Sequence, residues 1–162
     1  MNKKGKKVAK KHKKAENRIK AKIKAAKAND LLTWASLRAQ LWPSHSIEDH
    51  RKGTEQDLER PDRRCFLAVS GERVVGFIEM SLRSVVDGCA SSPVAYIEGW
   101  YVSPEVRKLG VGRALVAAGE NWGRERGCSE IGSDTELHNE LSIRAHAALG
   151  YEEENRVVQF RK

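Results

Sequence analysis

Residues 101–116, which read YVSPEVRKLGVGRALV, decide the fold that this sequence predicts. An apolar stretch ends at Val102, a loop containing a proline follows, and apolar residues then recur at helical spacing. Gly110 and Gly112 lack a Cβ, so the backbone between the strand and the helix can come close to a ligand. The first amides of a helix that begins at Leu109 have no intrahelical partners, and with the helix dipole they favour a bound anion. Three basic residues surround this position: Arg107, Lys108 and Arg113.

The loop motif by itself leaves a second interpretation open, which is an ordinary glycine-containing helix start with surface cations. Its spacing differs from the dinucleotide-binding fingerprint, because its glycines are two residues apart and a basic residue stands three positions before the first. It also lacks the Gly-Lys-Ser/Thr sequence of a nucleotide-binding P-loop. The rest of the chain therefore has to decide between an anion site and a surface loop.

The apolar pattern outside this loop predicts an α/β fold with a single mixed sheet. Helices are expected at residues 30–42, 46–59, 109–126 and 139–149, and strands at 21–26, 65–70, 74–82, 94–102, 129–134 and 151–160. The first strand competes with a helix, because Ala and Lys are strong helix formers. The predicted order is β-α-α-β-β-β-α-β-α-β, with helices on both faces of the sheet.

The net charge of +8 combines two regions of opposite sign. Residues 1–27 hold 13 Lys and Arg against one acid, whereas residues 28–162 hold 17 Lys and Arg against 21 Asp and Glu. We expect residues 1–18 to form a disordered basic tail and residues 19–162 to form one folded domain. The acidic domain favours cationic small molecules, whereas the tail favours phosphate polymers. Because the tail has no interleaved aromatic residues, only weak contact with nucleic acid is expected.

The apolar runs, cysteines and histidines of the sequence indicate the cellular compartment and whether a metal is bound. No apolar run approaches the ~20 residues that span a bilayer, so no membrane contact is expected. Cysteines without paired spacing suit a reducing, cytoplasmic environment, and these are Cys65, Cys89 and Cys128. No metal is expected, because the histidines form no ligand cluster in the sequence: His12, His45, His50, His138 and His146.

The pattern Arg-x-x-Gly-x-Gly, after a central strand and at the start of a long helix, resembles the acetyl-coenzyme A loop of the GNAT acetyltransferase superfamily. The predicted order of elements is also the order in that superfamily. The resemblance implies acetyl-CoA as co-substrate, with its pantetheine along the end of the strand and its pyrophosphate on the loop amides. The strand residues are Trp100, Tyr101 and Val102, and the loop residues are Lys108, Leu109, Gly110, Val111, Gly112 and Arg113, beside the Arg107 side chain.

A second stretch, HNELSIRAHAALGY at residues 138–151, extends this resemblance. Asn139 matches an asparagine that lies near the pantetheine arm in the superfamily. His146 stands where a tyrosine often protonates the leaving thiolate, and histidine can donate a proton near neutral pH. The alternative for His146 is a packed histidine with both ring nitrogens satisfied.

Four further segments narrow the resemblance to the aminoglycoside 6′-N-acetyltransferases. They are LRAQLWPSH, GCASSPVAYIEGWYV, SDT and ALGYEEENRVV, in this order along the chain. The match covers everything from about Ala21 onward. It implies a sugar-binding cleft that contains Trp42, His45, Glu98 and Asp134, and, as in many relatives, a homodimer. Val85 and Asn155 depart from the family, which has a tyrosine and an acid at these positions.

The chemistry of these four residues suits a polycationic sugar, although each has a structural alternative. Trp42 offers a flat apolar face for sugar rings, or it is a core tryptophan at the end of a helix. His45 lines the cleft, or it is a solvated turn residue. Glu98 interrupts an apolar strand, which is costly unless it lies in a wet cleft or pairs with a cation such as Arg83. Asp134 lies at the end of a strand near the thioester, or it is a turn or helix-capping residue.

The implied mechanism is direct transfer of the acetyl group between two substrates held side by side. Glu98 or Asp134 would take the proton of the acceptor amine, and Glu79 is a weaker candidate. Backbone amides near Tyr101 would stabilise the oxyanion, and His146 would assist the departing thiolate. Two other functions remain open: acetylation of a protein N-terminus, lysine or polyamine, and nucleic-acid binding through the tail.

Overall fold

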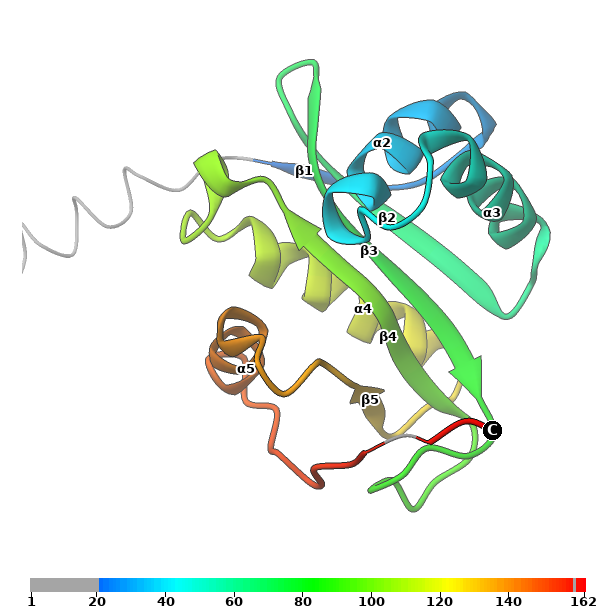
Figure 1. Ribbon diagram of the computed structural model, residues 1–162, viewed down its shortest axis with the longest axis vertical. Coiled ribbons are helices and arrows are strands. Elements are labelled where there is room, and N and C mark those ends of the chain that lie inside the picture. Colours follow the sequence, from blue (N-terminus) through cyan, green and yellow to red (C-terminus); the bar gives the residue numbers. More distant parts are fainter. Residues whose placement is uncertain (1–20, 159) are drawn as a thin grey trace, which may run out of the picture.

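The computed structural model describes residues 21–158 and 160–162, and its centre is a five-stranded sheet in the order β1-β2-β3-β4-β5 (Figure 1). The strands are β1 (Lys22–Ala25), β2 (Arg63–Ser70), β3 (Arg73–Arg83), β4 (Val94–Val102) and β5 (Ile131–Ser133). Neighbours from β1 to β4 are antiparallel, and β5 is parallel to β4. The predicted mixed sheet is confirmed, and residues 22–25 form the predicted strand rather than a helix.

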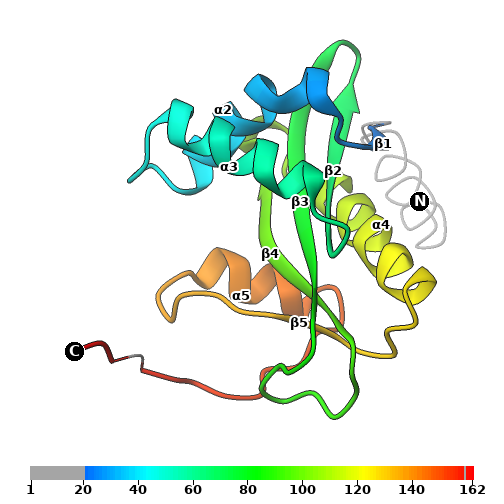
Figure 2. The ribbon, with the colours of Figure 1, turned by 90° about the vertical axis from the view of Figure 1, so that its right-hand side faces the viewer.

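Four helices pack around this sheet in the described residues: α2 (Leu31–Leu41), α3 (Ile47–Glu59), α4 (Val111–Glu125) and α5 (Glu140–Ala147). Short 3-10 turns at η1 (Ala28–Asp30) and η2 (Pro104–Val106) precede α2 and α4. The helices α2 and α3 lie on one side of the sheet and α4 lies on the other (Figure 2). The predicted helices on both faces are therefore confirmed.

Local sequence accounts for the helix ends that matter for the site. The helix α2 ends at Leu41, before Trp42, because Pro43 disfavours helical geometry in the residue that precedes it. Ser46 caps α3, since its hydroxyl accepts a hydrogen bond from the Asp49 amide at 3.1 Å. These two ends form a tight connection that holds Trp42 over the sheet.

The core has two layers because side chains along β3 alternate between the two faces. Phe77 packs with Trp34 and Leu67 under α2, whereas the next residue, Ile78, packs with Leu115 of α4. The buried side chains of β3 continue to Ser81, so this strand runs through the centre of the molecule. The sheet is therefore a rigid support for groups at its β4 edge.

The predicted strand over residues 151–160 is wrong for the residues that the structure describes, which have no regular secondary structure there. A strand needs the edge of another strand, and within this chain the segment runs past the loop after β3 instead (Figures 1 and 2). Its apolar residues are uncovered: Val157 is 62% exposed, Val158 72% and Phe160 91%. The predicted basic tail, residues 1–18, lies outside the described residues. None of the described helices is long and apolar enough to cross a bilayer.

Candidate active site

The strands β4 and β5 separate at the middle of the sheet. Their last pair is Ile97 with Ser133, whereas β4 continues to Val102. Over residues 98–102 one backbone edge of β4 pairs with β3, and the other edge has no strand partner in the described part of the chain. An extended ligand can hydrogen-bond to such an open edge as a further strand would. Trp100, Tyr101 and Val102 all lie on it.

The loop after β4 presents the start of α4 to the same opening. Gly110 is the N-cap of α4 with φ +94°, and Lys108 also has a positive φ, +63°. The first backbone bond into the helix runs from Ala114 N to the Gly110 carbonyl, so the amides of residues 111–113 lie before it. Unpaired amides in a left-handed turn at a helix N-terminus form an anion site. These residues therefore fit the pyrophosphate of a coenzyme A thioester.

The two glycines of this loop serve different purposes. Gly110 needs its left-handed backbone, and no atom lies within 4 Å of the Cβ that another residue would add. At Gly112 an added Cβ would lie 2.7 Å from Cζ2 of Trp100. Gly112 therefore lets α4 pack closely on Trp100, in addition to any ligand that it accommodates.

The predicted loop cations also have partners within the fold. Arg107 donates from Nε to the Val102 carbonyl at 2.8 Å, which ties the loop to the end of β4. Arg113 donates to the Ala148 carbonyl at 3.1 Å, which ties α4 to the end of α5. Each guanidinium keeps further N–H donors. Lys108 adds a third cation to the same loop.

His146 lies at the point where β4 and β5 separate. Its Nδ1 is 2.9 Å from the Ser142 carbonyl, and its Nε2 is 3.0 Å from the Ser133 hydroxyl. The carbonyl can only accept, so Nδ1 donates and Nε2 accepts in the neutral ring. The ring also contacts Trp100 edge-on, with centroids 5.5 Å apart. His146 thus lies beside Trp100 with both ring nitrogens satisfied, as in the alternative of a packed histidine, and its role toward a thioester stays a prediction.

Asn139 is the N-cap of α5, and its side-chain oxygen accepts a hydrogen bond from the Ser142 amide at 3.1 Å. This bond fixes the first turn of α5 and leaves the side-chain NH₂ group free to donate. The cap and the His146 contacts thus both involve Ser142.

A β-bulge in β4 directs Glu98 toward the α2–α3 side of the sheet. Glu79 pairs with Gly99, whereas Met80 pairs with Ile97, so Glu98 is the extra residue. The bulge places Glu98 and Gly99 on the same side, and Trp100 returns to the α4 side. The sequence did not indicate this bulge, although a glutamate next to a glycine inside an apolar strand is a signal for one.

The Glu98 carboxylate is held by three side chains. It accepts hydrogen bonds from the Ser81 hydroxyl at 2.5 Å and from Arg83 Nη2 at 2.8 Å, and Arg63 Nη1 lies 3.7 Å away. Burial on its own raises the pKa of Glu98, but Arg83, Ser81 and Arg63 together hold this pKa below its usual value. Glu98 is therefore an anion at neutral pH. The ion pair with Arg83, which the sequence left as an alternative, is present.

Trp42 and His45 border a hollow of about 370 Å³ between α2 and α3. The Trp42 ring lies over Gly99, where an added Cβ would approach Cη2 of Trp42 to 2.4 Å. The Arg38 guanidinium lies 5.2 Å from the centre of this ring, and its position four residues before Trp42 could have indicated the contact. His45 is exposed, with its ring 5.8 Å from that of the buried His50. His50 itself binds the Trp42 carbonyl through Nε2 at 2.9 Å.

Asp134 is exposed and directly follows β5. Burial, and then the neighbouring Asp134 carboxylate, raise the pKa of the Tyr96 phenol above its usual range. The structure therefore brings Asp134 close to Tyr96 and Arg83. Val85 and Asn155, where the sequence departs from its family, are both exposed.

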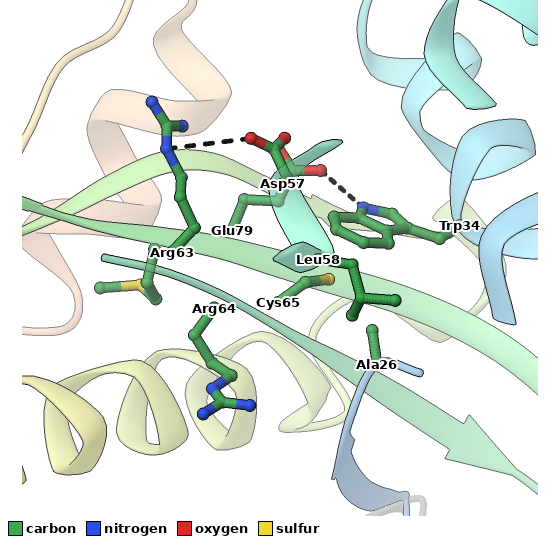
Figure 3. Close-up of a pocket in the computed structure, with 9 residues that line it drawn as sticks. Ala26, Trp34, Asp57, Leu58, Arg63, Arg64, Cys65 and Glu79 are labelled. Carbon is green, nitrogen blue, oxygen red and sulfur yellow. Dashed lines mark hydrogen bonds and ion pairs between the residues drawn. The ribbon is translucent and has the colours of Figure 1, made fainter. Parts of the chain in front are cut away.

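Glu79 is the most deeply buried carboxylate of the site and borders a small cavity of about 20 Å³ (Figure 3). Trp34 Nε1 donates to its Oε1 at 2.6 Å, and Arg38 Nε lies 3.4 Å from the same oxygen. Burial raises the pKa of Glu79 to about 7, against the opposing effects of Arg38 and Trp34. Its other oxygen lies under Gly99, 3.4 Å from the position of an added Cβ.

Comparison with known proteins agrees with this geometry. The model of the acetyltransferase (GNAT) family matches residues 31–151. The aminoglycoside N(6′)-acetyltransferase type 1 of Salmonella typhimurium is 42% identical over 130 residues, which make up 80% of this chain and 90% of the relative. The enzyme of the same name from Serratia marcescens is 43% identical over 136 residues, or 83% and 93% of the two chains.

Solved structures of similar sequence share the fold. The structure of AAC(6′)-Iy in complex with the bisubstrate analogue CoA-S-monomethyl-acetylneamine has a TM-score of 0.84 and 39% identity, covering 88% of this chain and 97% of that one. AAC(6′)-Ih from Acinetobacter baumannii has a TM-score of 0.83 and 35% identity, covering 88% and 97%. The resemblance seen in the sequence is thereby confirmed. The chain belongs to the acetyltransferase (GNAT) family.

Proposed function

We propose that this protein is an aminoglycoside 6′-N-acetyltransferase, which transfers the acetyl group of acetyl-CoA directly to the 6′-amino group of aminoglycoside antibiotics and so confers resistance. The observation that supports this most is the meeting of two features at the middle of β4. One is an open backbone edge that leads to an amide-lined turn. The other is an anionic carboxylate, Glu98, which precedes Gly99, the residue that the Trp42 ring approaches. The names of the relatives support the same acceptor.

In this proposal each substrate has its own side of the strand. The amides of residues 108–113 hold the pyrophosphate of acetyl-CoA, and the free edge of residues 100–102 orients its pantetheine. The acceptor lies on the α2–α3 side, where Trp42 and His45 contact its sugar rings and Glu98 and Asp134 attract its ammonium groups.

The chemical step then needs little beyond positioning. The attacking amine must be neutral, and Glu98 or Asp134, directly or through water, takes the proton that it loses. The bulge at Glu98 leaves backbone amides along the free edge for the developing oxyanion. The attacked thioester carbon gains the C–N bond and loses the C–S bond, and the thiolate takes a proton. For His146 to supply this proton its ring must be doubly protonated, because the neutral ring donates its single N–H to the Ser142 carbonyl.

We also propose a cytoplasmic homodimer. The three cysteines are free thiols, which suits a reducing compartment. The uncovered residues Val157, Val158 and Phe160 form an extended apolar segment that a second copy of this chain could cover. A mass of twice 18.2 kDa in sedimentation velocity would support the dimer, whereas a monomer at micromolar concentration would contradict it. Contact of the basic tail with nucleic acid stays a weaker proposal, which rests on its charge alone.

A panel of acceptors tests the activity. Purified protein with acetyl-CoA is expected to acetylate kanamycin and tobramycin with kcat/KM at least 100-fold above that for spermidine or a basic peptide, because the cleft selects sugar rings and several ammonium groups together. Release of free CoA thiol measures the rate. Equal rates with spermidine or the peptide would favour the second function left open by the sequence, a housekeeping acetyltransferase.

A further inference from the structure

A line of alternating charges connects the hollow beside Trp42 to Glu98. Arg38 lies 3.4 Å from Glu79 and 3.2 Å from Asp57, and Arg63 lies 3.8 Å from Asp57 and 3.7 Å from Glu98. Arg83 ends the line at 2.8 Å from Glu98. We call this set the charge ladder, and its members in order are Glu79, Arg38, Asp57, Arg63, Glu98 and Arg83. They come from β3, α2, α3, β2, β4 and again β3.

Arg63 holds the central place in the charge ladder because of strand register. It pairs with Ser81 on β3, and the Ser81 hydroxyl is hydrogen-bonded to Glu98 on the next strand. Asp57 reaches Arg63 from α3, above the sheet (Figure 3). The side chains of Arg63, Asp57 and Glu98 are 27%, 21% and 19% exposed, so solvent screens these charges less than it screens charges on the surface.

The contacts of Arg63 are unusual for a guanidinium with a structural role. Its Nε is buried and has no hydrogen-bond partner among the described residues. Its approaches to Asp57 and Glu98, at 3.8 and 3.7 Å, are ion pairs too long for hydrogen bonds. A guanidinium that served to tie the fold together would use its donors, as Arg83 does. What Arg63 brings to this place is its charge.

We propose that Arg63, anchored by Asp57, is a positioning residue that keeps the Glu98 carboxylate a fixed anion for an ammonium group of the acceptor. This inference rests on the proposed function, because it assigns Glu98 to binding of the aminoglycoside. In this arrangement Glu98 attracts an ammonium group, and the proton of the attacking amine goes to another base, such as Asp134.

The pKa of Glu98, and with it the pH dependence of any activity that needs its charge, depends on the charged and titratable groups around it. They come from every element around it: Arg83 on β3, Arg63 on β2, Tyr96 on β4, Arg60 at the end of α3, and Asp134 after β5 by way of Arg83. Of the cations, only Arg63 lacks hydrogen bonds to an acid, so its removal changes the field at Glu98 with the least rearrangement.

The test compares Arg63→Met with Arg64→Met. The two arginines are adjacent in β2, but Arg64 pairs with Met80 and points toward the α4 side, away from Glu98 (Figure 3). Both variants lose one positive charge from the same strand, and only one loses it beside Glu98. Arg63→Lys keeps the charge and serves as rescue, and Arg63→Gln replaces the methionine variant if that one is unstable.

The readout is kcat/KM for kanamycin as a function of pH, with KM for acetyl-CoA measured alongside. Loss of a charge ~4 Å away weakens ionisation of Glu98, so the acid limb should move up by about 0.5 to 1 pH unit in Arg63→Met. On this acid limb KM for kanamycin should rise about fivefold. KM for acetyl-CoA should stay unchanged, and Arg63→Lys should stay near the parent values. The same profile in Arg63→Met as in Arg64→Met would overturn the proposal.

Failure of the proposed function has a different signature. If the unmodified protein does not acetylate kanamycin, the acceptor assignment fails. A carbon-13 NMR titration of the Glu98 carboxyl in the same variants then still decides the electrostatic part of this inference. An upward shift of the Glu98 pKa in Arg63→Met alone supports it, and no shift refutes it.

Discussion

Two glutamates on neighbouring strands, Glu79 and Glu98, show how surroundings rather than residue type set protonation. Glu98 has an arginine bonded to it and stays an anion, whereas Glu79 is buried and its pKa rises to about 7. From the sequence, Glu98 was the stronger candidate base and Glu79 the weaker one. The burial that raises the pKa of Glu79 could not be predicted from its position in a strand. Arg63, the partner that the sequence missed, lies 35 positions before Glu98 in the chain and meets it only through strand pairing.

Glu79 should make stability depend on pH in the direction opposite to that of a typical carboxylate. Its pKa in the folded protein lies above its usual 4.5, so the folded state holds a proton that the unfolded state releases. The contribution of Glu79 to stability is therefore fully present below about pH 4.5 and is lost as the pH rises through about 7, a loss on the order of 2 kcal/mol between pH 5.5 and 8. Urea unfolding of Glu79→Gln should lose this part of the slope.

The control for that measurement is the exposed Glu125→Gln, which removes a carboxylate at the end of α4. It should keep the slope of the parent protein. If Glu79→Gln and the parent had the same pH dependence, Glu79 would be ionised in the folded state at neutral pH.

Helices and strands that follow from local periodicity were predicted from the sequence. Features that depend on pairing with a distant strand were missed. The helix α2 and its end at Pro43, the capped start of α3 and the hairpin of β2 and β3 all follow from short-range signals. The strand expected at 151–160 fails because alternation cannot say whether an edge is available. The bulge at Glu98 was also missed. Gly99 inside the strand is a local signal for a bulge, but only the register with β3 shows that Glu98 is the extra residue.

The turn into α4 can be tested with two glycines of the same conformation. Gly110 and Gly127 flank α4, have φ of +94° and +81°, and each has open space around an added Cβ. Valine at either position should cost ~1–2 kcal/mol of stability through backbone strain. Only Gly110→Val should also lower CoA affinity, by about 100-fold, because its side chain would lie at the pyrophosphate site. Calorimetric titration with CoA measures this, and equal affinities in the two variants would contradict the loop assignment.

The whole molecule combines a central sheet, an amide-lined turn at the start of α4, proposed for the cofactor, and a proposed acceptor side with the charge ladder, whose members come from five elements. The family and the cofactor could be predicted from the sequence, because the motif Arg-x-x-Gly-x-Gly lies within six consecutive residues, 107–112. Trp42, Glu98 and Asp134 lie far apart along the chain, so no local pattern groups them into one site. Their assignment to the acceptor site came only from the resemblance to the family. The contacts of Trp42 with Gly99 and of Asp134 with Tyr96 arise only in the folded protein.

Acetyl transfer to the 6′-amino group is tested most directly with two aminoglycosides, neomycin and paromomycin. They differ only at the 6′ position, where neomycin has an amine and paromomycin a hydroxyl. Each is incubated with the full chain and acetyl-CoA, and products are measured by mass spectrometry. One added acetyl group is expected on neomycin and none on paromomycin under the same conditions. Equal acetylation of both compounds, or of neither, would contradict transfer to the 6′-amino group.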